Sequence, residues 1–170
     1  FVIGDTSMRL AATSTAIQNW ASNSAADTGN SEDALVTADE YLGIFYPPGQ
    51  TNDLSGNTIV VPASHMILRT IARSDDQSFP WFAPAGTRRG LVDNANAIGF
   101  INSATGEFQV DNVRESLRDT LYSNRVNPIT FFNGVGLMNY GQKTRAATTS
   151  SLDRINVARL ANYLRSQLQA

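Results

Sequence analysis

An α/β (α+β) fold, in which helices flank a mixed sheet, is predicted from three features of this 170-residue sequence. Short runs rich in β-branched and aromatic residues, such as 40–46 and 58–61, are typical of buried strands. They alternate with amphipathic segments of helical period, such as 110–123 and 151–169. A hydrophobic content of 42% without a run of about 18 apolar residues indicates one globular core and no membrane-spanning helix.

The chain opens with a strand pattern at 1–4, and a helix is predicted to follow it. Asp5 or Thr6 is the expected N-cap, and the helix should continue to about Asn23. One face of this helix is formed by residues that recur every three or four positions: Leu10, Thr13, Ile17 and Trp20. Residues 22–37 are rich in small and polar residues and lack an apolar period, which predicts a surface loop.

Two strands and a helix are predicted in the next part of the chain. The aromatic run 40–46 reads as a strand that ends at Pro47-Pro48-Gly49, and a turn is expected at 52–57. The β-branched run 58–61 is the second strand. Pro62 suits the first turn of a helix, which should end near Ser74.

An aromatic loop buried on one side is expected at 79–86, because two prolines and a glycine interrupt it. The amphipathic segment 110–123 predicts a helix capped by Asp111 or Asn112. Its inward residues are Val113, Leu117 and Leu121. Asn127-Pro128 is expected to break the chain before a strand at 129–132.

A hairpin and a final helix complete the predicted elements. Asn133-Gly134 is typical of a hairpin turn, so 135–140 should return as the partner of 129–132. The last helix is predicted at 151–169, with its apolar residues mostly on one stripe. These residues are Leu152, Ile155, Leu160, Leu164 and Leu168. Because a strand pattern stands at the first residue and a helix pattern at the last, the chain is expected to be part of a longer protein.

The net charge of −2 is too small to indicate nucleic acid as a partner. Its distribution is uneven, since residues 1–60 carry seven acids and one base, whereas residues 61–170 carry eight acids and twelve bases. The two parts therefore have net charges of −6 and +4. This pattern fits either solvated charge spread by chance or head-to-tail stacking of identical copies. Cysteine is absent, which excludes disulfides and thiolate metal sites from these residues.

Catalytic and cofactor motifs are not found in the sequence. The single histidine, His65, cannot form a zinc site without cysteines and is expected to be structural. The acidic pairs 32–33, 39–40 and 75–76 are expected to be solvated loop residues. The segment Gly136–Thr144 resembles a phosphate-binding loop, but Gln142 separates Gly141 from Lys143, which moves the lysine out of register by one residue. We therefore expect neither an enzyme nor a cofactor, and a nucleotide-binding enzyme that uses Gly136–Thr144 is the alternative.

Two groups of motifs resemble contractile-tail sheath proteins of tailed bacteriophages. The first is Trp81-Phe82-Ala83-Pro84-Ala85-Gly86-Thr87-Arg88-Arg89-Gly90, where a tryptophan precedes Pro-Ala-Gly and then Arg-Gly. The second runs through 121–122, 126–129, 134–136, 141–144 and 153–160. Order and spacing agree over about 110 residues from Val60 onward. Ala158 departs from the pattern, since many relatives carry an arginine there.

The resemblance implies a mechanical role without catalysis. Residues 1–170 would form a single, incomplete core sheath domain that lacks the C-terminal strand with which a subunit joins its neighbour's sheet. The implied partners are other copies in a six-fold helical lattice, the tail tube protein, and the baseplate and tail terminator proteins, with no nucleic acid and no membrane insertion. The implied location is the virion tail, after assembly in the host cytoplasm. A sheath of a bacterial contractile injection system is the alternative.

The resemblance also supplies the candidate assembly residues. Trp81, Phe82 and Leu121 are expected in the core, whereas Pro84 and Gly86 should fix the loop conformation. Arg88, Arg89, Lys143 and Arg154 are expected to form salt bridges, either between subunits or within one chain. The full set is Trp81, Pro84, Ala85, Gly86, Arg88, Arg89, Gly90, Asn127, Pro128, Gly141, Lys143, Thr144, Asp153, Arg154, Asn156 and Arg159.

Overall fold

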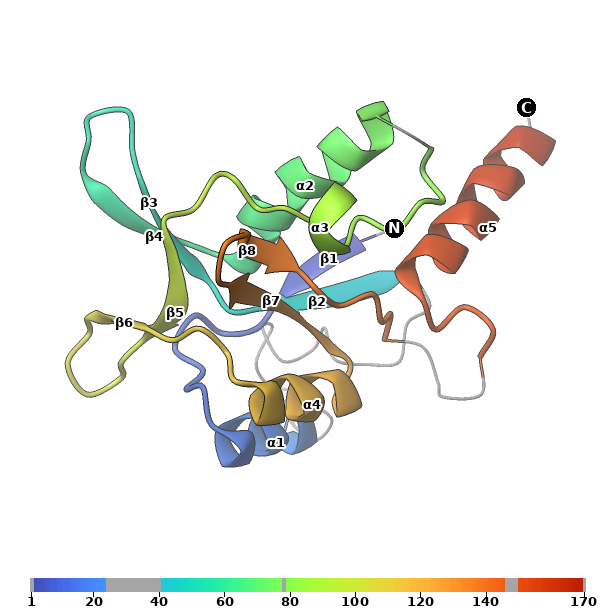
Figure 1. Ribbon diagram of the computed structural model, residues 1–170. Helices are drawn as coiled ribbons and strands as arrows, with labels where there is room; N and C mark the ends of the chain where they lie inside the picture. The colour runs from blue at the N-terminus through green and yellow to red at the C-terminus, as the bar shows by residue number, and fades with distance from the viewer. Residues whose placement is uncertain (1, 24–40, 78, 146–149, 170) are drawn as a thin grey trace.

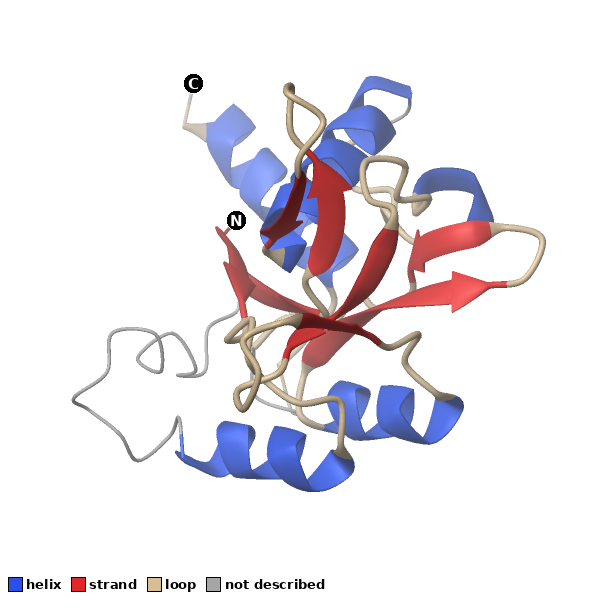
Figure 2. Cartoon of the chain, turned by 90° about the vertical axis from the view of Figure 1, so that its left-hand side faces the viewer, coloured by secondary structure: helices blue, strands red, loops and turns tan. Residues whose placement is uncertain are grey.

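Helices lie on both faces of a sheet in the computed structural model, which describes residues 2–23, 41–77, 79–145 and 150–169. Helices α2, α3 and α5 lie above the sheet in Figure 1, and α1 and α4 lie together below it. Figure 2 shows the same arrangement after a quarter turn. The predicted mixed α/β architecture is confirmed. The predicted surface loop at 22–37 falls almost entirely outside the described residues.

The first sheet has the strand order β1-β2-β7-β8 and is mixed. Its strands are β1 (Val2–Asp5), β2 (Leu42–Tyr46), β7 (Val126–Phe132) and β8 (Gly136–Asn139). β2 is parallel to β1 and to β7, and β8 returns antiparallel to β7 as the predicted hairpin partner. The five residues of β2 are all buried, as expected for an apolar run in the middle of a sheet.

The expected break at Asn127-Pro128 is wrong, because both residues lie inside β7. Pro128 lies opposite Tyr140, one residue beyond the end of β8, and its carbonyl accepts a hydrogen bond from the Tyr140 amide (3.0 Å). The nitrogen of Pro128, which has no hydrogen to donate, therefore lies beyond the last residue of β8, where the strand pairing needs no donor.

The second sheet is antiparallel, with the order β4-β3-β5-β6. Its strands are β3 (Gly49–Asn52), β4 (Thr58–Val61), β5 (Ala97–Ile101) and β6 (Phe108–Val110). Only β4 is predicted from the sequence. The β3–β4 turn is fixed by Asp53, whose carboxylate accepts hydrogen bonds from the amides of Ser55 (2.9 Å) and Asn57 (2.8 Å).

The first helix, α1 (Ser14–Asn23), begins seven or eight residues later than predicted from a cap at Thr6 or Asp5. Thr13 precedes it and its hydroxyl accepts a hydrogen bond from the Ala16 amide (3.2 Å), so Thr13 is the cap. Asp5 instead caps α2 (Ala63–Gln77), since its carboxylate accepts hydrogen bonds from the Ser64 amide (2.7 Å) and hydroxyl (2.6 Å). Asp5 is therefore a helix cap, as predicted, but the helix that it caps is α2, where its partner Ser64 lies 59 residues further along the chain.

The remaining helices are α3 (Gly86–Arg89), α4 (Glu115–Ser123) and α5 (Ile155–Leu168). α4 starts later than predicted, because the Asp111 carboxylate accepts a hydrogen bond from the Val113 amide (3.0 Å) in the turn before the helix. Arg114 occupies the N-cap position without a side-chain hydrogen bond. Leu117 and Leu121 are buried as predicted.

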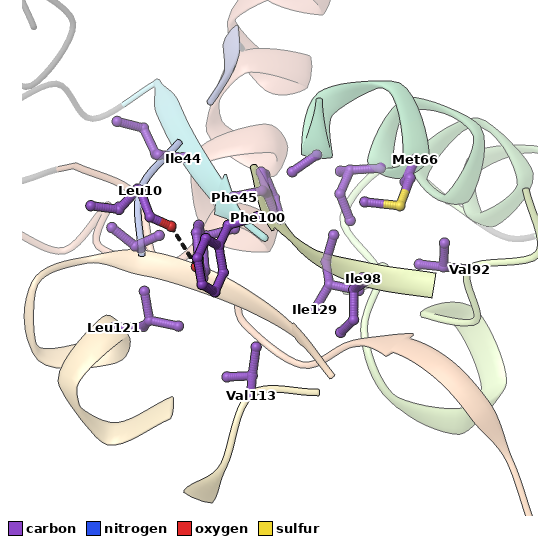
Figure 3. Close-up of a cluster of buried hydrophobic side chains, with 14 of the residues drawn as sticks. Leu10, Ile44, Phe45, Met66, Val92, Ile98, Phe100, Val113, Leu121 and Ile129 are labelled. Carbon is purple, nitrogen blue, oxygen red and sulfur yellow. Dashed lines mark hydrogen bonds between the residues drawn. The ribbon is translucent and has the colours of Figure 1, made fainter. Parts of the chain in front are cut away.

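One hydrophobic core joins both sheets to the helices, as Figure 3 shows. Ile44 and Phe45 of β2 and Ile129 of β7 are fully buried, and Ile98 of β5 extends the cluster into the second sheet. Met66 and Leu121 cover the cluster from α2 and α4. The second half of α5 does not join this core, since Leu164 is 51% exposed and Leu168 87%. The apolar stripe predicted for the last helix is therefore buried only at its beginning, where Ile155 is fully enclosed.

Stability should fall above pH 10 because of Tyr46. Its buried hydroxyl donates a hydrogen bond to the Leu10 carbonyl (2.9 Å), and burial, followed by the charge of Asp111, raises the pKa of the phenol well above its usual range. Because the folded state holds the phenol proton more tightly than the unfolded state does, the protonated Tyr46 stabilises the fold. This stabilisation is complete below the unfolded-state pKa of about 10, and above that pH it falls by about 1.4 kcal/mol per pH unit.

The measurement is urea unfolding of the wild type and of Tyr46→Phe between pH 8 and pH 11.5. The stability difference between the two proteins should be constant below about pH 10 and should shrink above it. A difference that stays constant over the whole range would contradict the assignment to Tyr46.

Candidate assembly site

The candidate assembly residues fall into two clusters. The junction cluster joins the middle of β2 and the beginning of β7 to the start of α5. Its members are Asn127, Pro128, Gly141, Lys143, Thr144, Asp153 and Arg154. The aromatic turn, residues 79–90, connects α2 to the segment that covers the edge of β8. Most of these residues hold the fold together, and a minority lie on the surface.

Asn127 is the centre of the junction cluster and is fully buried. Its side-chain amide donates hydrogen bonds to the Ile44 carbonyl (3.1 Å) and the Lys143 carbonyl (2.8 Å). Its side-chain oxygen accepts a hydrogen bond from the Lys143 amide (2.6 Å). One side chain thus ties the central strand β2 to the segment that leads into α5.

Gly141 and Thr144 complete the junction. A Cβ on Gly141 would lie 2.6 Å from the Cα of Asn127, so only glycine allows the two backbones to approach this closely. The Thr144 hydroxyl donates a hydrogen bond to the Leu152 carbonyl (2.7 Å), and its amide donates to the Asp153 carbonyl (3.0 Å). The Ile155 amide donates to the Gln142 carbonyl (2.7 Å), which fixes the first turn of α5.

Lys143 is engaged within the chain. Its ammonium donates a hydrogen bond to the Tyr122 carbonyl (3.1 Å) and lies 3.9 Å from the centre of the Tyr122 ring. Desolvation, followed by the nearby charge of Arg125, lowers the pKa of Lys143. Gly136–Asn139 forms strand β8, and residues 140–145 contain no helix, so the segment lacks the loop-to-helix geometry that cradles a phosphate.

The aromatic turn is fastened to β8 by Asn139 and Gly90. The buried Asn139 side chain donates a hydrogen bond to the Pro84 carbonyl (2.8 Å), and the Asn139 amide donates to the Gly90 carbonyl (2.7 Å). A Cβ on Gly90 would lie 2.6 Å from the Cα of Ala85, so the turn closes on itself too tightly for any other residue. Gly86 has φ +80°, in the left-handed region that favours glycine. These contacts explain the Pro-Ala-Gly and Arg-Gly motifs in conformational terms.

The aromatic side chains of the turn are more exposed than predicted. Phe79 stacks on Trp81 (ring centres 4.8 Å apart), and Trp81 contacts Tyr163 of α5 (5.4 Å). Phe79 and Phe82 are 55% and 38% exposed. The expectation that Phe82 belongs to the core is wrong, whereas Leu121 is fully buried as expected.

The motif arginines play different roles. Arg159 of α5 forms an ion pair with Asp75 of α2, and its side chain is only 12% exposed. Arg89 donates a hydrogen bond to the Ala83 carbonyl (3.2 Å) and lies over the Phe82 ring (4.8 Å), so it acts within the chain. Arg88 and Arg154 are exposed. Asn156 is partly buried on the first turn of α5.

Several surface residues have no signal in the sequence. Leu54 at the tip of the β3–β4 hairpin and Phe131 and Val135 of the β7–β8 hairpin are exposed. The Asn-Gly turn signal places 131–135 at a hairpin end, but no sequence pattern distinguishes an exposed apolar residue from a buried one there. His65 is also exposed, on α2.

The described residues contain no group of three or more His, Cys, Asp or Glu placed to hold a metal ion. No helix in the described ranges is long and apolar enough to cross a bilayer. Five of the seven acids of residues 1–60 lie at 24–40, outside the part that the structure describes. The predicted meeting of an acidic and a basic region therefore remains a prediction.

Comparison with known proteins places this geometry in context. No protein-family model matches the sequence. The tail sheath protein of Vibrio phage KVP40 is 37% identical over 108 residues, which are 64% of this chain and 14% of that protein. The tail sheath protein of Enterobacteria phage T4 is 35% identical over 108 residues, 64% of this chain and 15% of that protein. The chain thus spans about one seventh of the length of these relatives.

The fold is also found in a solved sheath. The sheath complex of the extracellular contractile injection system PVC, in its contracted state, superposes with a TM-score of 0.66 at 19% identity. The match covers 98% of this chain and 39% of that chain. At this identity the match establishes the fold alone.

Proposed function

The chain is a relative of the contractile tail sheath proteins, and on that premise we propose that it is part of a phage sheath subunit that polymerises into a helical tube. Copies in a six-fold lattice would surround the tail tube protein and bind baseplate and tail terminator proteins at the ends. Contraction would then drive the tube through the host envelope for genome ejection. Residues 1–170 would form an incomplete core sheath domain that acts by assembly and not by catalysis, in a virion tail assembled in the host cytoplasm.

The observation that carries this proposal is the agreement of sequence and fold. The 108 residues aligned with each of two phage sheath proteins make up 64% of this chain, and nearly the whole chain superposes on a sheath structure. In this chain the motif residues fix the aromatic turn and the start of α5. A rigid unit of this kind suits a lattice whose subunits move as bodies.

The edge of β1 supports a strand-exchange contact between copies. At the other edge of the first sheet, β8 is covered by residues 90–92, through hydrogen bonds from Asn139 to Gly90 (2.7 Å) and from Val92 to Leu137 (2.9 Å). Among the described strands, β1 pairs only with β2. We place the incoming strand of a neighbouring copy on β1, because an unpaired edge binds extended segments through backbone hydrogen bonds.

Electron microscopy of the full-length protein tests the proposed function. Purified protein should form tubes with a helical repeat, and addition of the tube protein should increase their number. A full-length protein that stays monomeric at every salt and protein concentration, with or without the tube protein, would refute the proposal.

Reversing the charges of Arg88 and Arg89 to glutamate should weaken assembly of the full-length protein at low salt. The two arginines lie on α3, and charge pairs across an interface contribute to association most strongly at low ionic strength. Sedimentation of tubes measures the effect. Since Arg89 is engaged with Ala83 and Phe82, the single change Arg88→Glu should produce most of the loss. Unchanged assembly of the double variant at low salt would contradict the prediction that these arginines contribute to the contact between copies.

A sheath of a bacterial contractile injection system is the second candidate, because the PVC sheath has the same fold. The phage relatives are 35–37% identical, compared with 19% for the PVC chain, which favours the phage sheath. The genes that neighbour the coding sequence separate the two, since capsid genes accompany only the former.

A further inference from the structure

We propose that a pocket beside α4 receives the side chain of Arg88 from a neighbouring copy; this inference rests on the proposed function and names one contact of the assembly. The pocket has a volume of about 400 Å³ and lies between α4 and the segment that follows β8. Its wall includes Glu115, Arg118, Asp119 and Tyr122 from α4, and Tyr140 and Gln142 from the facing segment.

The wall of the pocket is suited to a cation. Glu115 and Asp119 are exposed carboxylates one helical turn apart, and neither forms an ion pair with another described residue. Arg118 is held against the wall by the rings of Tyr140 (4.9 Å) and Phe132 (5.6 Å), so the residues that line the pocket include two carboxylates and one guanidinium.

The remaining groups favour a guanidinium over an ammonium. Tyr122 and Tyr140 contribute aromatic rings to the wall, and each ring has a cation of its own chain over one face, Lys143 (3.9 Å) and Arg118 (4.9 Å), which leaves the opposite face for an incoming group. Gln142 adds a polar side chain to the wall. A guanidinium is planar, stacks on aromatic rings and has five N–H donors in a fixed arrangement. An arginine can therefore use the rings and the oxygens of this pocket together.

Arg88 is the arginine that matches this pocket by charge and by position. It is exposed on α3, and it has no hydrogen bond or ion pair with the described residues, unlike Arg89. α3 lies above the sheet and α4 below it in both Figure 1 and Figure 2. A contact between α3 of one copy and α4 of the next joins unlike ends of the molecule. Such a contact repeats without closing and produces an open stack.

Disulfide cross-linking in the full-length protein tests the proximity. The 170 residues contain no cysteine, so engineered pairs can be introduced here without competing thiols. A mixture of the Arg88→Cys and Asp119→Cys proteins should give a cross-linked dimer under mild oxidation. The pairs Arg154→Cys with Asp119→Cys and Arg88→Cys with Ser103→Cys are matched exposed controls. A yield no higher than that of either control overturns the proposal, even if the protein forms no tubes.

Charge exchange tests the energetics. Arg88→Glu and the double change Glu115→Arg with Asp119→Arg should each raise the protein concentration needed for tube formation by about tenfold or more. Combining all three changes should restore most of the assembly. If the combined variant is no better than the singles, or the singles assemble like the wild type, the Arg88 contact is refuted while the sheath function stands. Absence of tubes from the wild type refutes the sheath function itself.

Discussion

Replacing Asn127 by alanine is expected to lower the free energy of unfolding by about 3–5 kcal/mol. The change removes three hydrogen bonds at once and leaves the Ile44 carbonyl, the Lys143 carbonyl and the Lys143 amide without the partner they have in the wild type. Because Asn127 is fully buried, water cannot replace these bonds without opening the junction.

Urea unfolding followed by circular dichroism measures the effect. Asn19→Ala is the matched control, since Asn19 is exposed on α1, and its loss should change stability by less than about 0.5 kcal/mol. An Asn127→Ala protein within about 1 kcal/mol of the wild type would show that the junction cluster does not hold α5 to the sheet.

Replacing Gly141 by alanine is expected to lower the free energy of unfolding by about 2–3 kcal/mol. The added Cβ would lie 2.6 Å from both Cα and Cβ of Asn127, which forces the backbones apart. Gly4→Ala is the control, because the nearest atom to a Cβ there is the end of the Leu42 side chain at 3.3 Å. A penalty for Gly141→Ala no larger than that for Gly4→Ala would contradict this close approach of the two backbones.

The two changes should not be additive. Asn127→Ala removes the side-chain oxygen that a Cβ on Gly141 would approach to 2.7 Å, but it leaves the clash with the backbone of residue 127 in place. The double variant should therefore lose less stability than the sum of the single variants, as expected for residues that touch each other. Full additivity in a double-mutant cycle would show that the two residues act independently.

Local patterns predicted the elements whose sequence signal and tertiary role agree. The aromatic run of β2, the β-branched run of β4 and the Asn-Gly hairpin of β7–β8 all formed close to their predicted positions. β3 was missed because Gly-Gln-Thr-Asn carries no strand signal of its own. It is a strand because β4 and β5 supply hydrogen-bonding partners on both sides.

The sequence predicted that Asp5 caps a helix, but it did not predict which helix. A short acidic side chain such as Asp5 stabilises whichever helix N-terminus lies beside it, and sequence distance does not identify that helix. Here the β1–β2–α2 packing brings Ser64 to Asp5, while Thr13 caps the nearer helix. The order of the strands in the sheet decides that Asp5 caps α2 and not α1, and no local sequence pattern reveals that order.

The individual roles of the motif residues could not be predicted from the sequence. Arg88 and Arg89 are adjacent and chemically identical, yet one is exposed and the other is bound to its own turn. Lys143 likewise has no local pattern that reveals its contact with Tyr122, since that contact depends on the packing of α4 against β7. The pocket beside α4 combines residues separated by more than twenty positions and has no sequence signature.

The attachment of α5 has a mechanical consequence. Hydrogen bonds and the Arg159 ion pair fasten its first turn, whereas beyond that point it is braced by the ring contacts of Tyr163 with Trp81 and of Arg165 with Tyr41. A load near Leu168 acts roughly 20 Å from Ile155 at the start of the helix, given the helical rise of about 1.5 Å per residue. The ring contacts at Tyr163 and Arg165 therefore share the resulting torque with the start of the helix, where Asn127 and Gly141 hold the joint.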